Sequence, residues 1–367
     1  MKKFACIVGA RPNFMKMAPI LRAFEEHDAE TVLIHTGQHY DKNLSDVFFE
    51  ELGIKKPDVS LGVGSGSHAQ QTAKLLTALE DTFVAAKEEG KPFDRVIVVG
   101  DVNSTMAATL AATKLHIPVA HVEAGLRSFD RQMPEEINRL VTDSLSDLLL
   151  CSEPSGVEHL RKEGHPDKNI KLVGNVMIDT LLRQVEVARG RNLLTELELA
   201  SGTYCVVTLH RPSNVDTAEA LGALVDVLVE VSDRLPIVFP VHPRTKARLE
   251  SFGLTEKLEA AKGFHVLEPL GYNDFLCLTS QARVIVTDSG GLQEESTALR
   301  IPCLTMRQNT ERPVTVTEGT STLCGSDASA LHDNLAAVLS SSYKLGDCPV
   351  LWDGNAAERI AVELMKR

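Results

Sequence analysis

The chain has 367 residues, of which 43% are hydrophobic and 24% charged, so it belongs among globular proteins and is long enough for two domains. Its 38 Lys and Arg against 50 Asp and Glu give a formal net charge of −12, which argues against a general binder of nucleic acid or anionic membranes. Any phosphate must therefore be held by a local site.

Neither a targeting segment nor a membrane span is expected. The first residues run from basic to apolar, but the apolar segment stops at Gly9, which predicts a first strand. No run approaches the roughly 18 apolar residues that a membrane span requires. The seven cysteines form no C-x-x-C pair and are interpreted as reduced thiols. These features predict a cytoplasmic protein.

Short apolar runs alternate with amphipathic segments along the chain. In the first half they cover residues 4–8, 31–36, 95–99, 117–122 and 147–151. In the second half they cover residues 204–209, 236–241, 264–267, 283–287 and 302–306. This alternation predicts the α/β class, with two doubly wound, Rossmann-like domains facing each other across a cleft. We expect an N-terminal domain over 1–174 and a second domain over 175–354, with a final helix over 355–367 that packs back on the first.

The most informative loop is 287–295, which joins a buried strand to a helix. Ser289 can cap that helix, and Gly290 and Gly291 let the backbone approach a ligand while free N–H groups point outward. A phosphate would fit there, although an ordinary capped turn has the same pattern. Glu295 follows in what we predict to be the first helical turn, where it could bind sugar hydroxyls.

Three basic residues are expected near this loop or just after the first strand. Arg11 and Lys16 flank the start of a helix and could reach an anion in the cleft, or they form a solvated basic pair. Their segment lacks the G-x-G-x-x-G pattern, so no nicotinamide dinucleotide is expected. Arg312 follows another strand and adds a cation near the 287–295 loop.

Acidic residues follow two more strands and open a helix. Asp101 comes after the strand at 95–99 and is either a helix cap or a carboxylate of the cleft. Glu123 ends an apolar strand, where burial would raise its pKa and suit it to proton transfer. Glu135 and Glu136 lie in the first turn of a helix, where the helix dipole alone would explain them. Acids on three loops of one rim indicate acid–base chemistry.

Two histidines follow strands of the second half. His210 and Arg211 leave one strand end and face the cleft if both sheets are wound alike; a core histidine bonded to backbone is the alternative. His242 has a similar position. No metal site is predicted, because His35 and His39 have no carboxylate or cysteine at the usual spacing.

The order of the motifs is more specific than any one of them. The segments are GARPNFMKMAP, TGQH, GDVNST, HVEAGLR, PEEINR, TLHRPSN, PVHP, TDSGGLQEE and NTERP. Over nearly the whole chain they resemble the non-hydrolysing UDP-N-acetylglucosamine 2-epimerases. The resemblance implies a glycosyltransferase-B type fold, a homodimer, and neither cofactor nor metal. GARPNF is also similar to epimerases acting on UDP-2,3-diacetamido-uronic acids.

The resemblance also implies roles for individual residues. The implied catalytic residues are Asp101, Glu123, Glu135 and His210. The implied substrate-binding residues are Arg11, Lys16, Ser289, Gly290, Gly291, Glu295 and Arg312. Candidate regulatory residues are Gln38, Asp41, Gln70, Glu136, Arg211 and His242. The acidic loops are thereby assigned to the first domain and UDP binding to the second.

The implied activity interconverts UDP-GlcNAc and UDP-ManNAc for surface polysaccharide precursors. The hydrogen on C2 of an acetal sugar is not acidic, so without a nicotinamide cofactor elimination is the available route: UDP leaves C1 while a base removes H2, and UDP adds back to the resulting 2-acetamidoglucal after reprotonation on the opposite face. Cations and N–H groups would hold the departing diphosphate. A glycosyltransferase of the same build and a non-catalytic UDP-sugar sensor are the alternatives.

Overall fold

The computed structural model describes residues 1–37, 53, 55–64 and 66–366, without the side chain of Arg11. Two of the candidate regulatory residues, Gln38 and Asp41, lie outside the described residues. The contacts divide the chain into two compact units, Met1–Thr180 with Val350–Arg367, and Leu181–Pro349. Among the described residues, no helix combines the length and apolar character that crossing a membrane requires.

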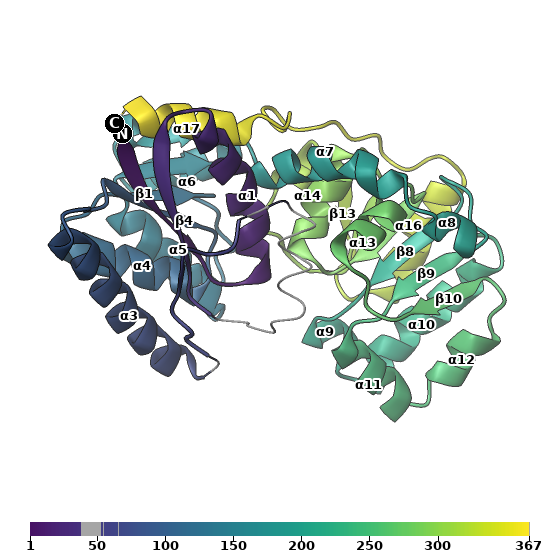
Figure 1. The fold of residues 1–367 in the computed structure, drawn as a ribbon. Coiled ribbons are helices and arrows are strands. Elements are labelled where there is room, and N and C mark those ends of the chain that lie inside the picture. Colours follow the sequence, from purple (N-terminus) through teal and green to yellow (C-terminus); the bar gives the residue numbers. More distant parts are fainter. Residues whose placement is uncertain (38–52, 54, 65, 367) are drawn as a thin grey trace. The chain divides into compact units, whose positions relative to one another are not determined.

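The first unit contains a seven-stranded sheet (Figure 1). Its strands are β1 (Lys2–Val8), β2 (Ala29–His35), β3 (Val59–Ser60), β4 (Arg95–Val99), β5 (Val119–Val122), β6 (Leu148–Cys151) and β7 (Ile170–Leu172). All pairs are parallel, in the order β3-β2-β1-β4-β5-β6-β7. The order reverses between β1 and β4, so the loops that follow these two strands diverge at the carboxyl edge. Such a switch point is where open α/β sheets bind ligands.

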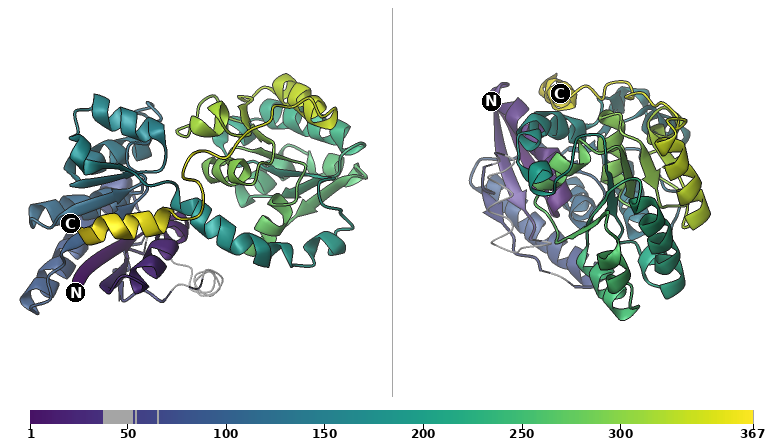
Figure 2. Two further views of the ribbon diagram at one scale, coloured as in Figure 1. Left: turned by 90° about the horizontal axis from the view of Figure 1, so that it is seen from above. Right: turned by 90° about the vertical axis from the view of Figure 1, so that its right-hand side faces the viewer.

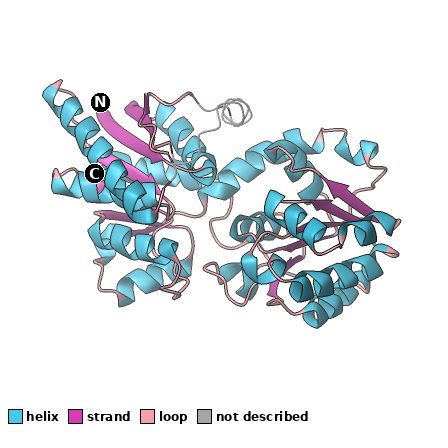
Figure 3. Cartoon of the chain, turned by 90° about the horizontal axis from the view of Figure 1, so that it is seen from below, coloured by secondary structure: helices cyan, strands magenta, loops and turns pink. Residues whose placement is uncertain are grey.

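Helices cover both faces of this sheet (Figure 3). They are α1 (Arg11–Glu25), α3 (His68–Glu88), α4 (Asn103–Lys114), α5 (Pro134–Leu145), α6 (Pro154–Lys162), η1 (Asp167–Asn169), the first part of α7 (Val176–Arg189) and α17 (Ala356–Lys366). Every residue of β4 is buried, as expected for a parallel strand with both faces covered. On one face, Val96 and Val98 pack with Leu75, Leu79 and Phe83 of α3.

The C-terminal helix α17 lies beside α1 (Figure 2). Lys2 Nζ donates to the carbonyls of Leu364 and Met365, at 3.1 and 3.0 Å, near the end of the helix. At its start, the Asp179 carboxylate accepts from the N–H groups of Ala356 and Ala357, at 3.2 and 2.8 Å. A cation thus satisfies the carboxyl end of α17 and an anion its amino end, in accord with the helix dipole.

Gly174 lies between β7 and α7, shortly before the chain leaves the first unit. Its φ is +90°, and a Cβ there would lie 2.1 Å from the carbonyl oxygen of Leu351. Arg359 Nη1 binds the same region, because it donates to the carbonyls of Val173 and Leu351 at 3.1 and 3.4 Å. The outgoing and returning segments therefore touch within this unit, and a side chain at position 174 would separate them.

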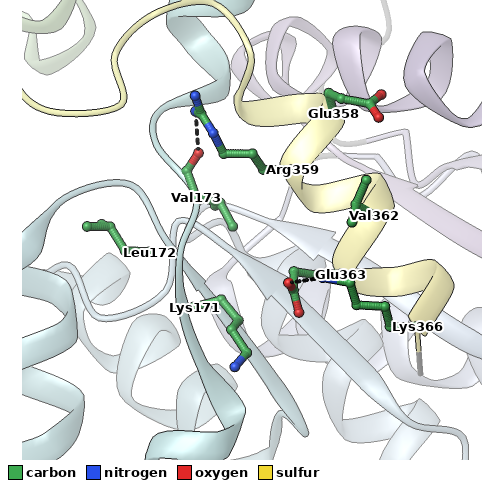
Figure 4. A pocket seen from close by; sticks show the side chains of 8 residues that line it. All are labelled: Lys171, Leu172, Val173, Glu358, Arg359, Val362, Glu363 and Lys366. Carbon is green, nitrogen blue, oxygen red and sulfur yellow. Dashed lines mark hydrogen bonds and ion pairs between the residues drawn. The ribbon is translucent and has the colours of Figure 1, made fainter.

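A groove of about 310 Å³ lies between β7 and α17 (Figure 4). It is lined by Lys171, Leu172, Val173, Glu358, Arg359, Val362, Glu363 and Lys366. Its charges are largely engaged already: Lys366 Nζ donates to Glu363 at 2.9 Å, and Glu358 pairs with His27 at 2.7 Å. The groove therefore offers little unpaired charge to a ligand.

The second unit contains a six-stranded parallel sheet. Its strands are β8 (Cys205–Thr208), β9 (Ile237–Pro240), β10 (Phe264–Leu267), β11 (Val284–Thr287), β12 (Cys303–Thr305) and β13 (Ser321–Leu323), in the order β10-β9-β8-β11-β12-β13. Its helices, after the end of α7, are α8 (Leu193–Glu196), α9 (Pro212–Val215), α10 (Ala218–Ser232), α11 (Pro243–Ser251), α12 (Thr255–Ala260), α13 (Tyr272–Thr279), α14 (Gly290–Ala298), α15 (Val314–Thr317) and α16 (Ala328–Leu339). The order reverses between β8 and β11, so this unit has its own switch point.

Candidate active site

Loops from three elements meet at the switch point of the first unit. Gly100 follows β4 with φ +70°, and a Cβ there would lie 3.4 Å from Asn13 Nδ2, 3.5 Å from Lys16 Nζ and 3.6 Å from Glu123 Oε2. Asn13 fixes the start of α1 against β4, since its Nδ2 donates to the carbonyl of Val99 at 2.9 Å. The positive φ of Gly100 favours glycine at this turn, and the three polar groups lie around it.

Glu123 is the most enclosed acid of this group, with 4% of its surface exposed. It forms an ion pair with Lys16, which is also buried. Its Oε2 takes this partner, whereas Oε1 is buried and has no hydrogen-bond partner within the described residues. Its φ of +70° is unusual for a residue with a side chain and indicates a constrained backbone. The arrangement leaves one carboxylate oxygen able to accept from a ligand.

Asp101 and Glu136 share one cation. Arg139 pairs with Asp101, and its Nη2 lies 2.7 Å from Glu136 Oε2. Glu136 also accepts from the N–H groups of Ser128 and Phe129, at 2.9 and 3.1 Å. Burial opposes ionisation of Glu136, but the Ser128 N–H and Arg139 outweigh it and lower its pKa. Glu136, a predicted regulatory residue, therefore holds the loop before α5 in place.

Asp101 does not cap helix α4, so the helix-cap alternative for this residue is wrong. Helix α4 begins at Asn103, and Val102 occupies its N-cap position without a side-chain hydrogen bond. The Asp101 carboxylate is one-third exposed and points instead to Arg139. Glu135 lies in the first turn of α5, and within the described chain its side chain makes neither a hydrogen bond nor an ion pair. Asp101 and Glu135 are therefore both accessible to a ligand.

A buried ionic network that the sequence reading missed lies next to these loops. His121 is fully buried, with Nδ1 2.6 Å from Asp143 Oδ1 and Nε2 2.9 Å from the carbonyl oxygen of Gly100. Arg127 Nη2 lies 2.7 Å from Asp143 and 2.6 Å from Glu163. Burial opposes ionisation of Asp143, but His121 and Arg127 outweigh it and lower its pKa. The network fixes the turn at Gly100. The sequence feature that could have predicted it is the presence of His121 and Arg127 in one motif.

Asp288 is the centre of the second unit's switch point. It is fully buried and accepts from the N–H groups of His210 and Arg211, each at 2.9 Å, and from Asn214 Nδ2 at 3.0 Å. His210 Nδ1 lies 2.7 Å from Asp288 Oδ1. Burial opposes ionisation of Asp288, but His210 and the other donors outweigh it and lower its pKa. The sequence pattern alone assigns no role to Asp288.

The side chain of His210 is 41% exposed, so the alternative of a core histidine is wrong. Its ring nitrogen Nε2 has no partner in the part of the chain that the structure describes, and it can therefore contact a ligand. The ring of His242 lies 5.5 Å away, centre to centre. His242 Nδ1 accepts from the N–H of Arg244 at 3.2 Å, and burial together with the charge of His210 lowers its pKa. His242 thus caps α11.

Two further candidate regulatory side chains also have structural partners. Arg211 Nε donates to the carbonyl of Asp288 at 3.1 Å. Gln70 forms a capping box with Ser67 at the start of α3, in which the Ser67 N–H donates to Gln70 Oε1 at 3.3 Å. Neither contact tests a regulatory role, which stays a prediction.

The loop before α14 has an open helix start. Ser289 is in the N-cap position, but its hydroxyl makes no capping hydrogen bond, contrary to the cap that we predicted. A Cβ on Gly290 would lie 3.1 Å from Arg312 Nη1, whereas one on Gly291 would meet nothing within 4 Å. The helix start therefore presents backbone N–H groups and a hydroxyl to an anion, with the Arg312 guanidinium, paired with Glu294 and Glu311, beside it.

The position predicted for Glu295 in the first helical turn is wrong. Helix α14 begins at Gly290, so Glu294 and Glu295 lie beyond its first turn, and both are buried. Glu294 Oε1 pairs with Arg312 Nε at 2.6 Å. Burial, and then the charge of Glu294, raise the pKa of Glu295 to about 8. At neutral pH Glu295 is therefore mostly protonated and can both donate and accept.

This raised pKa predicts a pH-dependent stability. Because folded Glu295 holds its proton while the unfolded chain loses one near pH 4.5, its stabilising effect is complete at low pH and is lost as pH rises through about 8. The wild type is expected to lose about 2 kcal/mol of unfolding free energy between about pH 5.5 and 7. Glu295→Gln cannot titrate, so the variant should not show this loss. Urea unfolding followed by circular dichroism measures it. The exposed control Glu259→Gln should keep the wild-type profile, and an unchanged Glu295→Gln profile would contradict the assignment.

Comparison with known proteins shows the family. A family model described as UDP-N-acetylglucosamine 2-epimerase matches residues 22–365. A Methanococcus maripaludis protein named UDP-N-acetylglucosamine 2-epimerase is 41% identical over 365 residues, covering 98% of this chain and 97% of that protein. A Pseudomonas aeruginosa protein named UDP-2,3-diacetamido-2,3-dideoxy-D-glucuronate 2-epimerase is 39% identical over 369 residues, with 99% of each covered.

The crystal structure of Methanocaldococcus jannaschii UDP-GlcNAc 2-epimerase in complex with UDP-GlcNAc and UDP is similar with a TM-score of 0.87 at 40% identity, covering 100% of both chains. This similarity and the two parallel sheets confirm the predicted fold class, two doubly wound domains of the glycosyltransferase-B type. The chain belongs to the UDP-N-acetylglucosamine 2-epimerase family.

Proposed function

We propose that this protein is an isomerase that interconverts UDP-GlcNAc and UDP-ManNAc for the synthesis of surface polysaccharide precursors. The observation that carries the proposal is the set of carboxylates at the carboxyl edge of the first sheet. Glu123 has a buried oxygen without a partner within the described chain, Asp101 is accessible on the loop after β4, and Glu135 is accessible in the first turn of α5. Removing and returning a proton at C2 on opposite faces requires more than one such acid or base.

The proposed reaction is an elimination followed by re-addition. A carboxylate among Asp101, Glu123 and Glu135 takes the proton from C2 while the C1–O bond breaks, its electron pair goes to the diphosphate, and C1 and C2 become doubly bonded. UDP adds back to this 2-acetamidoglucal after C2 is reprotonated on the other face. His210, whose Nδ1 lies 2.7 Å from Asp288 Oδ1, is positioned to stabilise the diphosphate as it gains charge.

The remaining site residues are assigned to substrate binding. We propose that the phosphates and sugar are held by Arg11, Lys16, Ser289, Gly290, Gly291, Glu295 and Arg312. The support is the open start of α14 and the cation of Arg312 beside it. The acidic loops would then belong to the N-terminal domain and UDP binding to the C-terminal one.

A second substrate has specific support. The Pseudomonas aeruginosa relative is nearly as similar as the methanogen relatives, and its name gives a 2,3-diacetamido-glucuronate as the sugar. Epimerisation at C2 is common to both names, so the substituents at C3 and C6 distinguish the candidates.

Incubation of the purified protein with UDP-GlcNAc alone in D2O tests the proposal. We expect NMR signals of the manno epimer with deuterium at C2, because the abstracted proton exchanges with solvent. UDP-2,3-diacetamido-glucuronate, supplied in parallel, identifies the preferred sugar. Binding of either sugar without turnover or exchange would contradict the proposal and favour a glycosyltransferase or a sensor.

Assembly and regulation are proposed from the family alone. We propose a cytoplasmic homodimer, which sedimentation equilibrium measures. Regulation by UDP-GlcNAc through Gln38, Asp41, Gln70, Glu136, Arg211 and His242 would appear as a sigmoidal dependence of the rate on substrate. A monomer, or a hyperbolic rate curve, would count against the respective proposal.

A further inference from the structure

Arg307 is a buried cation that no sequence motif singled out. It follows β12, is 5% exposed, and has its main chain fixed on both sides. Its N–H donates to the carbonyl of Thr305 at 2.9 Å, and its carbonyl accepts from the N–H of Gly325 at 3.1 Å. Its position is therefore set by the end of the sheet.

One half of its guanidinium is bound and the other half is open. Nη2 donates to Glu311 Oε2 at 2.8 Å. Nη1 is buried and has no hydrogen-bond partner within the described residues. A buried charged donor without an acceptor costs free energy, so this nitrogen is suited to an acceptor from a ligand.

The open nitrogen lies at the start of α14. Strands β11 and β12 pair with Thr287 opposite Thr305, so Ser289 and Arg307 each come two residues after this pair. Nη1 of Arg307 lies 3.7 Å from where a Cβ on Gly290 would be. The donor thus faces the turn whose backbone N–H groups are open to an anion.

Glu311 orients two arginines at this turn. Its Oε2 binds Arg307 and its Oε1 accepts from Arg312 Nη1 at 2.8 Å. Burial opposes ionisation of Glu311, but Arg312 and Arg307 outweigh it and hold its pKa far below the usual range. Glu311 bridges the two arginines and fixes the direction of both guanidinium planes, while Glu294 pairs with Arg312 alone.

We propose that Arg307 Nη1 donates to the diphosphate of the UDP-sugar and stabilises it as the leaving group, an inference that rests on the proposed function. When the C1–O bond breaks, its electron pair goes to the diphosphate, and the proton of C2 goes to a carboxylate. The negative charge on the diphosphate therefore rises in the transition state. A preoriented, desolvated guanidinium stabilises this charge more than that of the intact substrate.

Calorimetric titration of UDP into Arg307→Met tests the contact. We expect UDP affinity to fall roughly 10- to 100-fold, the range for a hydrogen bond to a charged group, and Arg307→Lys to recover part of the loss. Uridine, which lacks phosphates, should bind both variants as it binds the wild type in NMR titrations. The control Arg283→Met alters an arginine at the amino end of β11 and should leave UDP affinity unchanged.

The outcomes separate the contact from a structural role. Wild-type affinity for UDP in Arg307→Met, or an equal loss of affinity for UDP and uridine, would overturn the inference. Epimerisation by the wild-type protein is measured separately. If the wild type did not epimerise but Arg307→Met lost UDP affinity selectively, the proposed function would fail while the phosphate contact stood.

Discussion

Substitution of Glu123 by glutamine is expected to lower kcat for epimerisation by about 10³-fold, within the range that general acid–base groups contribute. The side chain keeps its size, and glutamine meets no more strain than glutamate at φ +70°. What is lost is the negative charge that pairs with Lys16 and the ability to accept or return a proton at the oxygen that lacks a partner in the described chain. Deuterium incorporation at C2 in D2O, followed by NMR, measures the effect directly.

The binding of UDP distinguishes loss of chemistry from loss of the site. We expect UDP affinity in Glu123→Gln to stay within about threefold of wild type, because most of the contacts proposed for UDP lie in the second domain and Glu123 is not among them. The control Asp94→Asn alters a carboxylate at the opposite edge of the same sheet, where Asp94 accepts from the N–H of Lys3, and should leave turnover unchanged. Turnover of Glu123→Gln within tenfold of wild type would remove Glu123 from the catalytic group.

Long apolar runs made the central strands predictable. The run at 95–99 is buried throughout and is β4 in the structure. The sequence reading did not find β3, β7 or β13, which have two or three residues each and lie at sheet edges. An edge strand that is partly exposed carries no continuous apolar run, so its existence depends on a neighbour distant in the sequence.

The site was predictable as a set of strand ends, but not in its pairings. Polar residues that follow parallel strands lie at the carboxyl edge of the sheet, and this rule places Asp101 and Glu123 together at that edge. The partner of Glu123 is Lys16, 107 positions away in the sequence, and no local pattern encodes that contact. Likewise the sequence places Glu295 in the first helical turn, because the Gly-Gly pair does not fix the residue at which α14 begins.

Substitution of Asp288 by asparagine is expected to destabilise the folded protein by about 1–3 kcal/mol, the cost of leaving a buried hydrogen-bond donor without its acceptor. Asp288 accepts from three hydrogen-bond donors and pairs with His210, and an amide would place its NH2 group against at least one of them. Since the pKa of Asp288 is lowered, its contribution is present above about pH 4 and is lost as pH falls through the native value. Urea unfolding at pH 7 and at a series of pH values below 4 measures both effects.

Turnover should fall as well, because Asp288 holds the His210 ring with Nε2 open to a ligand. We expect kcat of Asp288→Asn to fall about 100-fold at temperatures where the variant remains folded, the loss expected when one donor to a developing negative charge is no longer positioned. The exposed control Asp226→Asn breaks a surface pair with Lys257 and should cost less than about 1 kcal/mol without changing turnover. A folded Asp288→Asn variant with wild-type kcat would mean that the His210–Asp288 pair is structural, and the charge on the departing diphosphate would then have to be met by the arginines near α14.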